Sequence, residues 1–102
     1  MYQPLDGPSL QTTLSVNTTV VQQVMVGASA MAERKVVTIM PIDGKIYVYF
    51  AGTAGIPSSA TIIAHGFPQF KNALHSYEAT DSQLVYILAV SGTVSVKIVE
   101  RA

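Results

Sequence analysis

The chain contains no cysteine and no tryptophan among its 102 residues. The absence of cysteine excludes disulfide bonds, thiolate metal sites and a cysteine nucleophile. Charged residues make up 12% of the chain, against about 25% in typical soluble domains, whereas hydrophobic residues make up 49%. A surface with so little charge is expected to be covered in part by a partner, either copies of this chain or a larger assembly.

The chain also lacks a net charge, because its six basic residues are balanced by six acidic ones. A neutral chain has no electrostatic attraction to nucleic acid or to an anionic membrane, so neither is expected as a partner. No apolar run approaches the roughly 18 residues of a membrane-spanning helix. The first residues lack the basic and apolar regions of a secretory signal, so we expect a soluble protein.

Residues 35–50, KVVTIMPIDGKIYVYF, have the strongest strand pattern in the chain. Two runs rich in β-branched and aromatic residues flank Asp43-Gly44, a dipeptide typical of tight turns, which predicts an antiparallel hairpin. In its second strand Ile46, Val48 and Phe50 share the face expected in the core. Tyr47 and Tyr49 share the opposite face with Lys45.

The rest of the chain also alternates in the manner of strands. Residues 10–16 and 19–26 predict two strands, residues 28–34 a loop with at most one helical turn, and residues 51–59 a mobile loop. Residues 60–64 and 74–79 predict short strands on either side of an irregular loop. Residues 83–90 are apolar on both faces, as in a strand covered on both sides. Ser91-Gly92 predicts a hairpin loop before residues 93–100, in which Val94, Val96 and Ile98 face inward.

About eight short strands separated by turn signals are the pattern of an all-β domain. Between a small barrel and a sandwich we favour a single-domain antiparallel β-sandwich of residues 10–102, jelly-roll-like or immunoglobulin-like. Residues 1–9 contain Pro4, Gly7 and Pro8 and predict an extended N-terminal arm.

Residues that would carry chemistry are sparse. His65 and His75 are the only histidines, and their spacing is not one of a metal site, so two surface histidines are the preferred interpretation. No serine lies in a GxSxG turn, and GTAG at Gly52 lacks the ending of a phosphate-binding loop. We therefore predict a protein that is not an enzyme, with no metal, cofactor or small-molecule substrate.

Tyr47 and Tyr49 support three interpretations. Exposed tyrosines hold sugar rings in many carbohydrate-binding sandwiches, although the absence of tryptophan weakens that interpretation. Aromatic side chains are also enriched at contacts between subunits. The third possibility is intramolecular, with a second sheet covering the two tyrosines.

The chain resembles small all-β virion proteins of tailed bacteriophages. The likeness lies in RKVVTIMPIDGKIYVYFAG, the glycine-rich GTAGIPSS after it, HSYEA, and the ending LVYILAVSGTVSVKIVERA. This pattern covers roughly residues 34–101, about two thirds of the chain. The Pro41-Ile42 step departs from the pattern and affects the turn type expected there. Members of this group decorate or cement capsids, or form part of the neck, tail or fibres.

The resemblance implies a virion protein made in the host cytoplasm that acts by assembly and not by catalysis. It implies a homo-oligomer, with a trimer favoured, bound to the major capsid protein or another virion protein. The arm would be a strap over neighbouring subunits, and either the face of Tyr47 and Tyr49 or the 51–59 loop would be a contact surface. The residues expected to contact a partner are Tyr2, Pro4, Leu5, Tyr47, Tyr49, Ile56, Phe67 and Phe70.

Overall fold

A computed structural model describes residues 9–26, 34–52, 56–80 and 83–101. Residues 1–8 of the predicted arm and most of the loop expected at 28–34 lie outside the described residues. The described elements in chain order are β1 (Ser9–Val16), β2 (Gln22–Gln23), β3 (Val36–Pro41), β4 (Ile46–Gly52), α1 (Ser59–His65), β5 (Phe67–Gln69), β6 (His75–Glu78), β7 (Leu84–Ala89) and β8 (Val94–Arg101).

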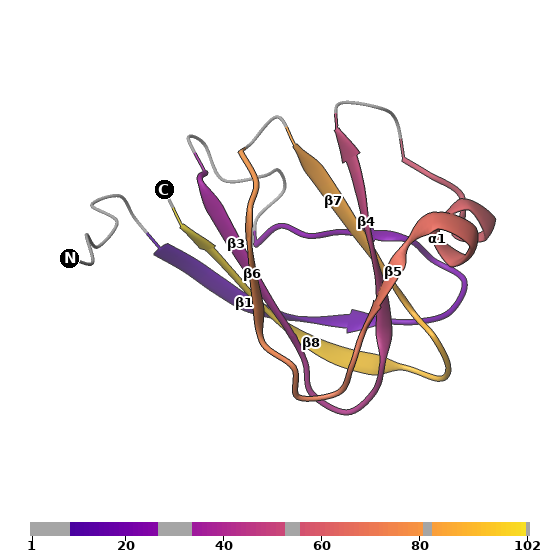
Figure 1. Cartoon of the computed structure of the whole chain (residues 1–102). Helices are drawn as coiled ribbons and strands as arrows, with labels where there is room; N and C mark the ends of the chain where they lie inside the picture. Colours follow the sequence, from indigo (N-terminus) through magenta and orange to yellow (C-terminus); the bar gives the residue numbers. More distant parts are fainter. Residues whose placement is uncertain (1–8, 27–33, 53–55, 81–82, 102) are drawn as a thin grey trace.

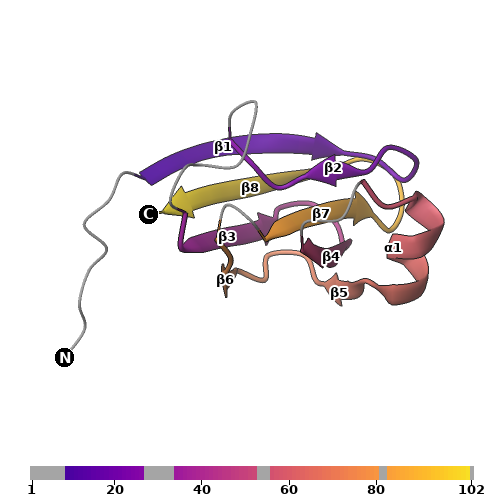
Figure 2. The ribbon, with the colours of Figure 1, turned by 90° about the horizontal axis from the view of Figure 1, so that it is seen from above.

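The strands form two four-stranded sheets with the orders β1-β8-β3-β6 and β2-β7-β4-β5 (Figures 1 and 2). Every pair is antiparallel, and β1 pairs with β8, β2 with β7, β3 with β6 and β4 with β5. The chain is thus arranged as one long hairpin folded over on itself, which is the jelly-roll arrangement. The predicted all-β sandwich is confirmed, and the strand order is not that of an immunoglobulin fold.

The hairpin predicted at residues 35–50 is wrong. β3 and β4 lie in different sheets, and the connection between them crosses from one layer to the other. Asp43 accepts a hydrogen bond at Oδ1 from the Ser95 N–H at 2.8 Å. Gly44 does not adopt a positive φ, but a Cβ there would lie 2.6 Å from Val94 Cγ2. The Asp-Gly pair therefore fits the crossing closely against β8 and does not form a tight hairpin turn.

The hairpin predicted at Ser91-Gly92 is wrong for the same reason, since β7 and β8 also belong to different sheets. Gly92 does have a positive φ of 62°, as a turn there requires. The two crossings run side by side, because the Val90 N–H donates to the Lys45 carbonyl at 3.0 Å. The β3–β4 connection is thus hydrogen-bonded to the β7–β8 connection, and neither connection closes a hairpin.

The core lies between the sheets and comes from alternate residues of the strands. In β8 the expected inward series is confirmed, because Val94, Val96 and Ile98 are buried. The double-sided apolar pattern of β7 is also confirmed: Val85, Ile87 and Ala89 face the core, and Tyr86 and Leu88 are buried on the outer face. The core side chains are Val16, Val24, Val37, Ile39, Ile46, Val48, Ala79, Val85, Ile87, Ala89, Val94, Val96 and Ile98.

The strand predicted at residues 60–64 is wrong, because this segment forms α1. Ser58 precedes the helix, and its side-chain oxygen accepts a hydrogen bond from the Thr61 N–H at 3.2 Å, as an N-cap does. Ile62 alone is buried, against the outer face of the β2-β7-β4-β5 sheet, where Figure 1 shows the helix beside β4 and β5. A five-residue apolar run fits a strand or a helix equally well, and only the cap distinguishes them here.

The strand predicted at 19–26 is reduced to the two residues of β2. Asn17 Oδ1 accepts hydrogen bonds from the backbone N–H of Thr19 at 3.0 Å and of Val20 at 2.7 Å. An asparagine side chain that replaces a backbone turn in this way holds the chain out of the sheet. The predicted strands at 10–16, 74–79 and 83–90 correspond to β1, β6 and β7.

Candidate partner-binding edge

One open edge of the sandwich gathers exposed apolar side chains. β5 and β6 are the edge strands of different sheets, and the segment between them passes from one sheet to the other. Phe67 is 40% exposed, Phe70 61% and Leu74 62%. Phe67 and Phe70 are two of the predicted contact residues, and the structure places both on this edge. We call the edge formed by β5, residues 70–74 and β6 the aromatic edge.

Three rings form a cluster at the aromatic edge. Phe67 stacks on Phe50 with 5.6 Å between ring centroids, and Tyr77 meets Phe50 edge-on at 5.2 Å. Phe67 and Tyr77 are 6.0 Å apart, and the imidazole of His75 lies 6.2 Å from the Tyr77 ring. These spacings are those of favourable aromatic pairs, so the rings hold one another in place while Phe67 stays partly exposed.

The buried side chain of Gln69 fixes the aromatic edge to the core. Its Nε2 donates hydrogen bonds to the carbonyls of Ile39 at 2.7 Å and Ala73 at 2.8 Å. Its Oε1 accepts one from the Tyr77 hydroxyl at 3.0 Å. A single amide thus joins β3, the 70–74 segment and β6, so the exposed apolar side chains stand on a rigid support.

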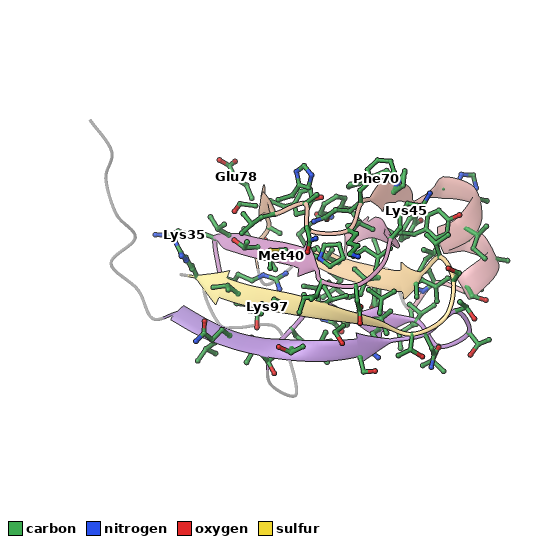
Figure 3. The ribbon with its side chains drawn as sticks, turned by 90° about the horizontal axis from the view of Figure 1, so that it is seen from below. Lys35, Met40, Lys45, Phe70, Glu78 and Lys97 are labelled. Carbon is green, nitrogen blue, oxygen red and sulfur yellow. The ribbon has the colours of Figure 1, made fainter. Side chains whose placement is uncertain are left out.

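The 70–74 segment has further anchors. The Asn72 N–H donates to the Pro41 carbonyl at 2.7 Å, and Asn72 adopts a φ of 63°, a conformation that asparagine tolerates. Lys45 Nζ lies 5.3 Å from the centre of the Phe70 ring, within the range of a cation–π contact. Figure 3 shows Phe70 and Lys45 close together, with Glu78 farther along the same edge.

An open depression of about 660 Å³ adjoins the ring cluster. Hydroxyl, carboxylate and amide groups line it beside the rings, so it offers both apolar and polar contacts. Burial raises the pKa of the Tyr77 hydroxyl, because a phenolate is poorly solvated there. The lining residues are Phe50, Ser76, Tyr77, Glu78, Thr80 and Gln83.

The tyrosine face is placed differently from the aromatic edge. Tyr47 and Tyr49 point to the outer face of their sheet, where they are half-buried against the cluster of Ile62, Tyr86 and Leu88. Part of the intramolecular interpretation therefore holds, although a helix and not a second sheet provides the cover.

The remaining predicted contact residues do not join the aromatic edge. Ile56 is exposed and lines a different depression, of about 370 Å³, together with Val21 and Tyr86 among others. Tyr2, Pro4 and Leu5 lie outside the described residues.

His65 and His75 are exposed, as the sequence suggested. Within the described ranges, no three His, Asp or Glu side chains are grouped so that they could hold a metal ion. No helix of these ranges is long and apolar enough to span a membrane.

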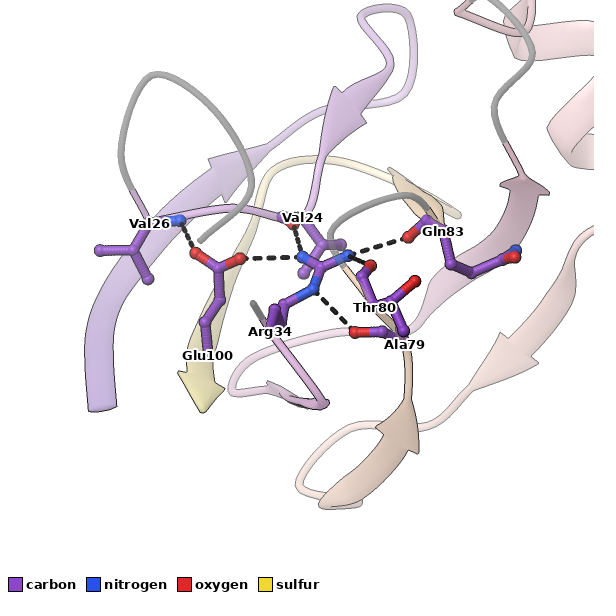
Figure 4. A network of polar contacts seen from close by, with 7 residues as sticks. All are labelled: Val24, Val26, Arg34, Ala79, Thr80, Gln83 and Glu100. Carbon is purple, nitrogen blue, oxygen red and sulfur yellow. Dashed lines mark hydrogen bonds and ion pairs between the residues drawn. The ribbon is translucent and has the colours of Figure 1, made fainter. Parts of the chain in front are cut away.

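A buried ion pair that was not predicted from the sequence lies at the end of the sandwich where β8 ends. Arg34 Nη1 lies 2.8 Å from Glu100 Oε2, and both side chains have no exposed surface (Figure 4). The guanidinium also donates to four carbonyls, and Glu100 Oε1 accepts from the Val26 N–H at 2.7 Å. The four carbonyls belong to Val24, Ala79, Thr80 and Gln83.

This network joins segments far apart in the sequence, and the hydrogen-bonding capacity of Arg34 is fully used by it. It is a structural clasp with no free donor on Arg34 for a ligand. A signal for it existed in the sequence, because Glu100 continues the inward series of Val94, Val96 and Ile98. A carboxylate on a buried face requires a buried partner.

No family model matches the chain, and no curated protein matches it.

Proposed function

We propose that the protein is a structural subunit of a tailed-bacteriophage virion, acting as a capsid decoration or cement protein that binds the assembled head. The observation that carries the proposal is the aromatic edge, where Phe67, Phe70 and Leu74 are exposed on a segment anchored by Gln69. Exposed apolar side chains on a rigid support favour binding, because little conformational entropy is lost when a partner covers them. The low charge of the chain and its resemblance to virion proteins support the same function.

The proposed mechanism is thermodynamic. A subunit that binds the assembled shell and not its free components stabilises the shell by mass action. Many copies with modest contacts add their effects through multivalency. Phe67 and Phe70 would meet the major capsid protein, and residues 1–8 would strap a neighbouring subunit. No reaction and no cofactor is part of this mechanism.

The test measures the occupancy of the protein on purified phage heads. Replacing Phe67 and Phe70 together by serine is expected to lower occupancy at least tenfold, because it removes the two exposed rings. Val20→Ser is the matched control, since Val20 is 56% exposed between β1 and β2, the edge strands opposite to β6 and β5. Unchanged occupancy of the double variant would remove the aromatic edge from the proposal.

Deletion of residues 1–8 tests the strap separately. We expect the shortened chain to bind heads weakly while its melting temperature stays the same. Full occupancy of the shortened chain would exclude the strap but leave the aromatic edge in place. Locating the protein in particles by electron microscopy separates a capsid position from the alternative positions at the neck, tail or fibres.

A second candidate function is carbohydrate binding, with the site moved from the tyrosine face to the aromatic edge. The specific observation is that the Tyr77 ring lines the same depression as the polar groups of Ser76 and Glu78, and that it lies 6.0 Å from the partly exposed Phe67 ring. An aromatic face beside hydrogen-bonding groups suits a sugar ring. Titration calorimetry with simple polysaccharides distinguishes the two functions, and Tyr77→Ala should abolish any heat of binding.

A further inference from the structure

In the part of the chain that the structure describes, no strand pairs with the outer edge of β1, although β1 is eight residues long. β1 pairs with β8 through all eight residues without a register shift, and it contains neither proline nor charge. The other edge strands are blunted: β2 has two residues, β6 has four, and β5 has three including Pro68. Short length, proline, charge and bulges are the usual protections against edge-to-edge pairing, and β1 has none of them.

Hydrogen bonds of β8 define which backbone groups of β1 point outward. The carbonyls of Ser95 and Arg101 point toward β3, because they accept hydrogen bonds at 2.8 Å from N–H groups of the residues that flank β3. The donors are Ile42 and Lys35, respectively. Backbone groups alternate in direction along an antiparallel strand, so the even-numbered residues of β8 bond to β1. The register pairs even residues with even residues. The N–H and C=O groups that point away from β8 are therefore those of Ser9, Gln11, Thr13 and Ser15.

A side-chain contact agrees with this assignment. Gln22, which lies on β2 in the other sheet, donates a hydrogen bond from its side-chain amide to the Ser15 carbonyl. Among the described residues, Gln22 is the only one with a hydrogen bond to this outward row. The backbone groups of Ser9, Gln11 and Thr13 are ready to pair with another strand.

We propose that β1 pairs with β1 of a second copy of this chain, antiparallel about a twofold axis at Thr12. The two four-stranded sheets would then form one continuous eight-stranded sheet. In this register Gln11 faces Thr13 of the partner subunit, and their outward N–H and C=O groups bond to each other. A twofold contact is closed, because the same surface is used on both sides.

The chemistry of the edge selects a second copy as the occupant. β1 is neutral, so pairing it with itself places no like charges opposite each other. Leu10 is 43% exposed and lies on the same face of β1 as the buried Val16. In the dimer it would contact Leu14 of the partner subunit. Lys97 of β8 lies opposite Thr13 of β1. In the dimer the two copies of Lys97 would be separated by three strand spacings, about 14 Å or more, which is beyond the screening length of about 8 Å.

This inference is independent of the proposed function and uses a different edge of the molecule. The first test is the mass of the purified protein by sedimentation velocity over a range of concentrations. We expect a monomer–dimer equilibrium that Gln11→Pro abolishes, because proline removes an outward N–H while no bond to β8 is lost. Gln11→Ala is the matched control, since it keeps that N–H and should still dimerise.

A monomer at every concentration would overturn the proposal, and so would a dimer or trimer that Gln11→Pro leaves unchanged. A cross-link covers the case in which the proline variant fails to fold. The chain has no cysteine, so Thr12→Cys introduces a single thiol. Two such thiols at the twofold axis lie within disulfide range, and oxidation should give a covalent dimer.

Thr13→Cys is the control for the register. In the proposed pairing its two thiols belong to residues about 8 Å apart at Cα, too far for a disulfide. A covalent dimer from Thr12→Cys and none from Thr13→Cys supports the twofold at Thr12. No covalent dimer from Thr12→Cys under oxidising conditions overturns it.

Discussion

The Arg34–Glu100 clasp and the aromatic edge each organise one part of the sandwich around a buried polar side chain. In the clasp, Arg34 makes five hydrogen bonds, one of which is the ion pair with Glu100, and neither side chain of that pair has exposed surface. At the aromatic edge, Gln69 is equally buried, but the side chains that it supports are exposed. The first arrangement closes an end of the fold, whereas the second presents apolar surface on a firm base.

A buried polar side chain thus serves a different purpose in each of the two places. The clasp satisfies every donor of Arg34 within the chain, so it has no capacity for a ligand and serves stability. Gln69 also has its partners within the chain, but they join the buried Ile39 carbonyl to the Ala73 carbonyl and the Tyr77 hydroxyl. Its hydrogen bonds therefore fix the segment that carries the exposed Phe70 and Leu74. Rigid exposed residues are what a binding surface needs.

The largest effect is expected from Glu100→Ala. Removing one partner of a buried ion pair leaves the other charge uncompensated, and such changes cost about 3–5 kcal/mol. Urea denaturation measures the loss in the free energy of unfolding. Arg101→Ala changes the exposed neighbour and should shift stability by no more than about 0.5 kcal/mol. A loss for Glu100→Ala as small as that of the control would contradict the role given to the clasp.

Gln69→Ala should have the next largest effect. It leaves the carbonyls of Ile39 and Ala73 and the Tyr77 hydroxyl without their partner, at about 1–3 kcal/mol. The near-ultraviolet circular dichroism of the aromatic cluster should also weaken, because the Tyr77 ring loses its anchor. Gln11→Ala, on the open β1 edge, is the matched glutamine control. Unaltered aromatic dichroism in Gln69→Ala would show that the contacts among the rings fix their positions without Gln69.

Tyr77→Phe is expected to cost about 1 kcal/mol at neutral pH, the value of one hydrogen bond. Its pH dependence is more informative. Burial raises the pKa of Tyr77 above its ordinary value of 10.0, so the folded state keeps the proton where the unfolded state releases it. This contribution to stability is complete below pH 10.0 and is lost as the pH rises through the folded-state pKa.

The wild type should therefore lose stability more steeply above pH 10.0 than the Tyr77→Phe variant does. Urea denaturation at a series of pH values from neutral to alkaline measures both slopes. Parallel slopes would mean that the phenol is as well solvated in the folded state as in the unfolded one.

The smallest effect on stability is expected from Phe70→Ala. The ring is 61% exposed and its contact with Lys45 is at the surface, so the loss should be about 0.5–1 kcal/mol. Lys45→Ala removes the same contact from the other side and should cost a similar amount. A loss of about 3 kcal/mol for Phe70→Ala would mean that the ring belongs to the core and not to a binding surface.

Part of the architecture was readable from residue patterns. The alternation in β8 and the double-sided apolar pattern of β7 depend only on the two-residue period of a strand, and both were predicted correctly. Glu100 could have been found from the same period. At the aromatic edge, Phe67 and Phe70 were predicted as contact residues, but Gln69 and Tyr77 were not, because a glutamine and a tyrosine have no local feature that shows which backbone groups they will reach.

The residue pattern is enough to predict short antiparallel strands with one apolar face, because side-chain alternation and turn residues are local properties. The tertiary structure sets which strands pair. Asp43-Gly44 and Ser91-Gly92 mark real turns, yet both turns cross between layers, since the β3–β4 and β7–β8 segments bond to each other. It also decided that a helix covers Tyr47 and Tyr49 and that Phe67 meets Tyr77. These contacts join residues distant in the chain, and only the burial of both sheets against one core brings them together.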